Sequence, residues 1–129
     1  TLQGNDSFYY VLPGLLPQQK PAELLIRRER ERQTEQDNES TQTQWHLTMK
    51  LDIGEQGELL TKAKIRDEQL YLDIYSSNQA LLEKVGGTLP FLLKRFTQLG
   101  LMVEEHKLQL GKIPDTLATR PYQILETQA

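Results

Sequence analysis

Residues 45–53 read WHLTMKLDI, and this stretch decides the fold class. Apolar side chains occupy every odd position from Trp45 to Ile53, and polar side chains occupy the even positions between them. Successive side chains of a β-strand point to opposite faces of a sheet. The alternation therefore predicts a strand with one buried face and one solvent-exposed face.

Two further strands follow this one at short intervals. The segment GEQG at 54–57 favours a turn, and residues 59–65 then alternate between an apolar set and a set that contains two lysines. Residues 66–69 favour a second turn, and residues 70–75 alternate once more. Three consecutive strands with short connections predict an antiparallel meander that has one apolar face.

The apolar face needs a covering layer, and residues 81–99 predict an amphipathic helix that supplies it. Ser77 or Asn78 suits the N-cap position, and Gly100 suits the left-handed position after the helix. Pro90 follows a pair of glycines inside this segment, so we expect it to kink the helix or to begin a second half. Apolar residues recur here at intervals of three and four: Leu81, Leu82, Val85, Leu89, Leu92, Leu93, Phe96 and Leu99.

The flanking segments predict further strands and an arm. Residues 7–12 (SFYYVL) and 23–28 are rich in aliphatic or aromatic side chains and predict one strand each. Residues 101–110 predict one more strand or one element of a strand pair. Residues 29–44 contain no apolar side chain, so we expect a mobile polar loop or an extended hairpin tip. Residues 111–129 predict an extended C-terminal arm. Its candidate docking points are Ile113, Tyr122, Ile124 and Leu125.

The chain of 129 residues is thus predicted to be a single α+β domain, an antiparallel β-meander with one long amphipathic helix on its apolar face and flanking N- and C-terminal strands. The net charge of -3 argues against a nucleic-acid partner. Cysteine is absent, which excludes disulfides and fits a reducing, cytoplasmic environment. We expect no membrane insertion, because the apolar runs are too short to cross a bilayer.

The sequence offers no set of residues suited to catalysis. His46 and His106 are the two histidines, and neither has a partner at a metal-ligating spacing. Glu104 and Glu105 precede His106, but adjacent residues on a strand do not converge on one ion. The sequence has no nucleophile-elbow motif and no glycine-rich phosphate loop. We therefore expect a protein that is not an enzyme and that has no metal or cofactor site.

The solvent face of the meander supports an alternative function. Basic and aromatic side chains on an open sheet can stack and bind single-stranded RNA, although the acidic total charge and two aspartates on the same face argue against it. A second alternative is a structural or oligomerisation module whose edge strand pairs with a copy of itself. The residues of the basic and aromatic face are Lys62, Lys64, Arg66, Tyr71 and Tyr75.

The stretch 45–110 resembles the C-terminal domain of the bacterial flagellar hook-length control protein. The likeness rests on KLDIGEQGEL at 50–59 and ALLEKVGGTLPFLLKRFTQLGL at 80–101. In the second segment Leu89-Pro90 is followed by spaced leucines and a terminal Gly100-Leu101. The likeness does not extend to residues 1–44 or to the tail after Gly111, and the chain has no counterpart of that family's long ruler segment.

This resemblance implies a non-enzymatic protein-interaction domain that acts in type III export. Its partner would be the cytoplasmic domain of the flagellar export gate, and its role would be to switch export from rod and hook subunits to filament subunits. The resemblance also allows passage of the protein through the flagellar apparatus. We take Leu89, Pro90, Gly100 and Leu101 as candidate partner-binding residues on the matching positions, and add Tyr122 from the arm.

Overall fold

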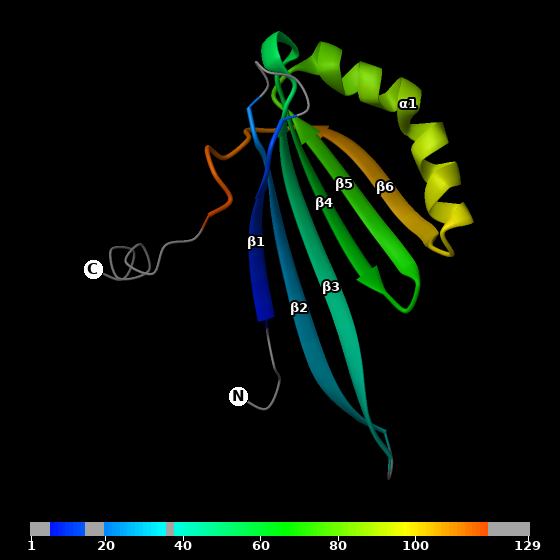
Figure 1. The fold of residues 1–129 in the computed structure, drawn as a ribbon. Helices are drawn as coiled ribbons and strands as arrows, with labels where there is room; N and C mark the ends of the chain where they lie inside the picture. The colour runs from blue at the N-terminus through cyan, green and yellow to red at the C-terminus, as the bar shows by residue number, and fades with distance from the viewer. Residues whose placement is uncertain (1–5, 15–19, 36–37, 119–129) are drawn as a thin grey trace.

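The described residues form a six-stranded sheet and one long helix (Figure 1). The computed structural model describes residues 6–14, 20–35 and 38–118. The strands follow one another in chain order across the sheet, antiparallel up to β5, and β6 lies parallel to β5 because α1 carries the chain back. The predicted α+β class is confirmed. The elements are β1 (Asp6–Leu12), β2 (Ala22–Glu35), β3 (Asn38–Asp52), a short 3-10 helix (Gly54–Gln56), β4 (Glu58–Arg66), β5 (Gln69–Ser76), α1 (Gln79–Gln98) and β6 (Met102–Leu110).

The segment 29–44 is a pair of strand extensions and not a loop. β2 and β3 remain paired from Glu23 opposite Lys50 out to Glu35 opposite Asn38, with residues 36 and 37 outside the described ranges. Of the two expectations for this segment, the extended hairpin is the one observed. Its backbone ladder needs no apolar side chain, because antiparallel pairing satisfies the N–H and C=O groups by itself.

The register of the sheet places the alternating residues as the sequence predicts. Leu47 lies opposite Ala63, which lies opposite Leu72, so these three side chains share one face. His46 and Lys64 lie opposite one another on the other face. We call the two surfaces the helix side and the far side of the sheet.

The buried core lies between α1 and the β4–β5 half of the helix side. Leu59, Leu72 and Ile74 from the sheet form one cluster with Leu81 and Leu89 from the helix. Burial of such side chains contributes about 1.5–3 kcal/mol each. The predicted apolar stripe on the helix is wider than this contact. Leu92 and Leu99 were expected to cover the sheet, but they are exposed at 40% and 63%.

Both ends of α1 have side-chain or backbone caps. The Asn78 side chain accepts hydrogen bonds from the backbone N–H groups of Ala80 and Leu81, as expected of an N-cap. At the other end, Gly100 has φ 92°, and the Leu101 N–H donates to the Phe96 carbonyl. This is the Schellman arrangement. Pro90 lies inside the helix, which continues through it and bends along its length (Figure 1).

The first part of the C-terminal arm lies against the far side of the sheet. The Lys50 Nζ donates to the Asp115 carbonyl oxygen at 2.7 Å, and the Leu117 N–H donates to the Glu23 carboxylate at 2.8 Å. Ile113 is buried, as its prediction as a docking point requires. Tyr122, Ile124 and Leu125 lie outside the described residues. In the described part of the chain, no helix is both long and apolar enough to span a membrane.

Candidate protein-interaction surface

The helix side of β1–β3 carries an apolar surface that α1 leaves uncovered. The register places these side chains on one face, whereas the helix packs over the β4–β6 half of the sheet. We call this surface the open apolar face. In Figure 1 the helix lies beside the β5–β6 edge, away from β1–β3. The open apolar face consists of Phe8, Tyr10, Leu12, Leu24, Ile26, Trp45, Leu47 and Met49.

Burial values separate the two halves of the sheet. Among the described side chains of β1, β2 and β3 none is buried, whereas Leu70, Leu72 and Ile74 of β5 are exposed by 3% or less. With strands about 4.8 Å apart and residues about 3.3 Å apart, the open apolar face spans roughly 15 Å by 20 Å. The largest apolar patch on a typical monomer is about 300–600 Å² and is often functional.

An ion pair marks one end of the open apolar face. The Arg28 guanidinium is bonded to the Asp6 carboxylate and lies over the Trp45 ring, 5.7 Å from its centroid. The Arg28 Nε is buried and has no hydrogen-bond partner among the described residues. A buried donor left unsatisfied costs about 1–3 kcal/mol.

The partner-binding residues proposed from the sequence lie at different depths. Leu89 is buried in the core and offers no side chain to a partner, whereas Pro90 is exposed on the outer surface of α1. Gly100 and Leu101 lie together at the end of the helix, in a shallow groove of about 590 Å³ that Leu93, Thr97 and Met102 also line. Met102 is 63% exposed. The groove is mixed in character, because Asp67, Glu68 and His106 line it as well.

The far side of the sheet brings the predicted basic and aromatic residues together. The Lys62 Nζ lies 5.5 Å from the centroid of the Tyr75 ring, and the Lys64 Nζ lies 4.7 Å from the centroid of the Tyr71 ring. These contacts are worth about 0.5–1 kcal/mol each at exposed sites. The Arg66 guanidinium donates to the side-chain oxygen of Gln42.

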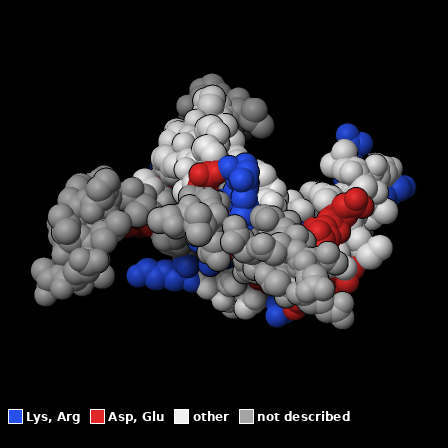
Figure 2. Space-filling view, turned by 90° about the horizontal axis from the view of Figure 1, so that it is seen from below, with Lys and Arg blue, Asp and Glu red and all other residues white. Residues whose placement is uncertain are grey.

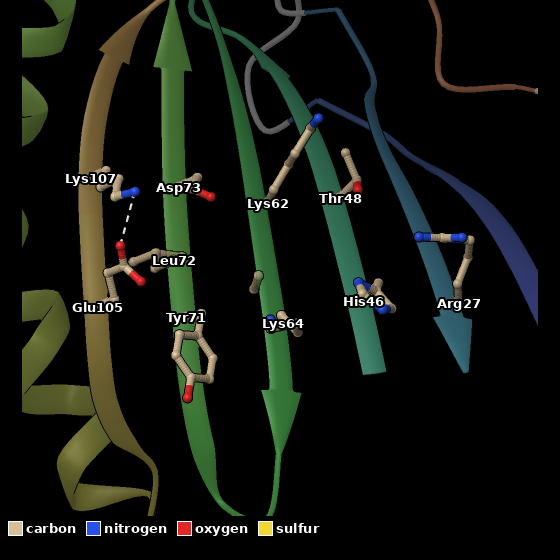
Figure 3. Close-up of a pocket in the computed structure, with 11 residues that line it drawn as sticks. Arg27, His46, Thr48, Lys62, Lys64, Tyr71, Leu72, Asp73, Glu105 and Lys107 are labelled. Carbon is tan, nitrogen blue, oxygen red and sulfur yellow. Dashed lines mark ion pairs between the residues drawn. The ribbon is translucent and has the colours of Figure 1, made fainter. Parts of the chain in front are cut away.

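A hollow of about 340 Å³ lies on this far side, lined from β2–β6 (Figure 3). Arg27, Lys62 and Lys64 meet Asp73 and Glu105 there, so charges of both signs face the same space. Hydrogen bonding to the Glu105 carboxylate, at 2.9 Å, together with its charge, raises the pKa of Lys107. Seen from the hairpin end, basic and acidic side chains also lie near one another (Figure 2). Mixed charge gives no strong attraction for a phosphate backbone.

The two histidines have ordinary surroundings. The His46 Nε2 lies 2.7 Å from the Glu29 carboxylate on the far side of the sheet, and His106 lies in the groove at the helix end. Within the described ranges no group of three or more His, Asp or Glu side chains is placed to hold a metal ion.

Sequence reasoning missed the open apolar face, although every one of its residues was visible in the strand patterns. The missing information was how much of the sheet α1 covers. An alternating strand predicts that one of its faces is covered, but it does not show which element covers it. A signal was available in the ratio of one helix to six strands, since a helix about 10 Å wide covers only about two strands spaced 4.8 Å apart.

No protein-family model matches the chain, and no match was found among curated proteins or among solved structures.

Proposed function

We propose that the chain is a non-enzymatic protein-interaction domain that binds its partner through the open apolar face. The observation that carries the proposal is the set of eight apolar side chains on one face of β1–β3, none of which is fully buried: Phe8, Tyr10 and Leu12 are exposed by 42–47%, and the other five are half-buried. Following the likeness of residues 45–110 to the hook-length control family, the partner we propose is the cytoplasmic domain of the flagellar export gate. The domain would there act in the switch of export substrate specificity.

The geometry of the open apolar face supports protein binding more than it supports catalysis. The open apolar face lies on a continuous antiparallel ladder, and its aromatic members Phe8, Tyr10 and Trp45 are of the residue types enriched at protein interfaces. The groove at Gly100 and Leu101 lies at the C-terminal end of α1 and offers a second contact surface for the partner.

The test is a binding measurement between the purified chain and the purified cytoplasmic domain of the export gate. Ile26→Thr and Leu47→Thr place a polar group on the open apolar face while keeping or raising strand propensity. Each substitution should weaken the affinity at least about tenfold, if the side chain lies near the centre of the interface. Calorimetry or surface plasmon resonance gives the dissociation constants.

Leu25→Thr is the matched control, because Leu25 lies on the same strand as Ile26 but on the far side of the sheet. It should leave the affinity unchanged. Equal losses from Leu25→Thr and Ile26→Thr would contradict the assignment of the surface, and no binding by the folded wild-type chain would contradict the export-gate partner.

The basic and aromatic face supports the second candidate, single-stranded RNA binding, because its five residues do lie on one side of the sheet. We rank it lower, since lysines already lie over the two tyrosine rings and acidic side chains share the hollow. RNA binding that weakens steeply with added salt and is unaffected by Ile26→Thr would favour this candidate over the export-gate proposal.

A further inference from the structure

The two edges of the sheet differ in how they are protected. β6 forms one edge, with Glu104, Glu105 and Lys107 along its middle and a register shift against β5. Charged side chains and irregular pairing are devices that prevent one sheet edge from pairing with another. β1 forms the opposite edge and pairs with β2 in unbroken register. Its Phe8–Leu12 run has no charge, no proline and no irregularity.

The exposure of β1 extends to both of its faces. Phe8, Tyr9, Tyr10, Val11 and Leu12 are exposed by 40% to 56%. Its one charged residue, Asp6, is already bonded to Arg28. Among the described residues nothing pairs with the outer edge of this strand. Such an edge presents a row of backbone N–H and C=O groups flanked by apolar side chains, which is a template for a further strand.

We propose that β1 pairs antiparallel with β1 of a second copy of this chain, about a two-fold axis at Tyr9, to give a homodimer with a continuous sheet. Only this centre pairs all seven residues of the strand with one another, because Asp6 and Leu12 are equidistant from Tyr9. The interface is isologous, as two-fold symmetry requires. This inference goes beyond the proposed function and does not depend on it.

The sequence of β1 is self-complementary in this register. Tyr9 lies opposite Tyr9 of the second copy on the far side of the sheet, and Phe8 lies opposite Tyr10 on the helix side. Aromatic pairs directly across an antiparallel ladder contribute roughly 0.2–1 kcal/mol each. The two remaining pairs, Ser7 with Val11 and Asp6 with Leu12, bring no like charges together. A peptide of unrelated sequence would lack this match.

The first experiment uses the absence of cysteine from the chain. Tyr9→Cys places two thiols across the two-fold axis, within the Cα separation that a disulfide spans. Mild oxidation should convert most of this variant to a covalent dimer. Ser7→Cys is the control, because its thiol would face Val11 of the second copy and should not form a symmetric disulfide. Cross-linking of both variants to the same extent would overturn the register.

The second experiment measures the oligomeric state by analytical ultracentrifugation across a wide range of concentration. Wild-type chain should dimerise, and Val11→Lys should raise the dimer dissociation constant at least about tenfold, because a lysine on the edge opposes pairing. Met102→Lys adds the same charge at the opposite edge and should leave the constant unchanged. Val11 lies on the far side, so partner binding by the open apolar face should survive this substitution.

A wild-type chain that stays monomeric at every concentration would overturn the proposal, as would equal weakening by Val11→Lys and Met102→Lys. Hydrogen exchange on the wild-type chain needs no substitution and guards against misfolded variants. Backbone amides of β1 that point away from β2 should gain protection as the concentration rises. Outward amides that exchange freely at all concentrations would contradict strand pairing.

Discussion

At the residue scale, Glu23 joins the C-terminal arm to the sheet. Its carboxylate accepts hydrogen bonds from the Thr116 hydroxyl at 2.7 Å, the Leu117 N–H at 2.8 Å and the Tyr9 hydroxyl at 2.7 Å. Burial by itself would raise the pKa of this carboxyl, but these three donors and the nearby Lys50 ammonium together lower the pKa below its ordinary value of 4.5. The hydrogen bond to Glu23 is also the main reason that the pKa of Tyr9 is raised.

The lowered pKa of Glu23 predicts that docking of the arm depends on pH. Because the folded-state pKa lies below the unfolded value, the stabilisation is present above the unfolded pKa and is lost as the pH falls through the folded one. We expect the Leu117 amide to be protected from hydrogen exchange at neutral pH. That protection should fall as the pH drops below 4.5, the ordinary value for this carboxyl, and through the lower folded-state pKa.

Glu23→Gln tests this origin of the pH dependence. The amide oxygen still accepts a hydrogen bond but carries no charge, so protection of Leu117 should be about tenfold lower at neutral pH and should not change on acidification through the carboxyl range. Glu58→Gln is the control, since Glu58 pairs with Lys50 at 3.1 Å but makes no hydrogen bond to the described part of the arm. An unchanged profile in Glu23→Gln would contradict the role of Glu23.

At the scale of one element, the glycines in and after α1 differ in whether the backbone needs glycine at their position. Gly87 lies inside the helix, and a Cβ added there would meet no atom within 4 Å. Gly87→Ala should therefore raise the free energy of unfolding by about 0.5–1 kcal/mol, because alanine loses less conformational entropy on folding. Urea denaturation measures the change.

Gly100→Ala should act in the opposite direction, although it is the same chemical change. Gly100 has φ 92°, which an L-residue adopts only at a cost of roughly 1–2 kcal/mol. If Gly100→Ala is destabilised while Gly87→Ala is stabilised, glycine is required at position 100 to end the helix, whereas position 87 accepts alanine. Stabilisation by both substitutions would mean that the Schellman turn is not required, and would leave Gly100 free for a partner-binding role.

The elements with a strong local pattern could be predicted from the sequence. Alternation over 45–53 and 70–75 fixed the side of the sheet for each residue, and short turns then fixed the register. For that reason the contacts of Lys62 with Tyr75 and of Lys64 with Tyr71 were predictable in outline. The Asn78 cap and the Gly100 turn could be predicted as well, because capping depends on residue type at one position.

The elements held by non-local pairing could not be predicted in the same way. The outer part of the β2–β3 hairpin has no apolar side chain, so composition favoured a loop, while the backbone ladder of neighbouring strands continues through it. Leu92 and Leu99 fit the helical stripe but lie outside the contact between the helix and the sheet. Which strands form the edges, and which part of the apolar face stays open, depends on the order of strands across the whole sheet.

At the scale of the whole molecule, stability should be distributed unevenly, because most buried side chains of the described residues belong to β4, β5 and α1, and none belongs to β1, β2 or β3. Leu72 is 2% exposed in that half, whereas Leu47 lies at the same level of the sheet on the open apolar face. Leu72→Ala should lower the free energy of unfolding by roughly 2–5 kcal/mol, since it leaves a cavity in a packed core.

Leu47→Ala removes the same atoms and should cost only about 1 kcal/mol, because part of its side chain already contacts water and no cavity forms. Urea unfolding of both variants at low concentration, with the slope of the transition checked for constancy, gives the comparison. Equal costs would mean that a segment or a second molecule covers Leu47 in solution. A large cost at Leu72 beside a small one at Leu47 would instead leave the open apolar face as surface that folding does not require, which is the condition for a binding site there.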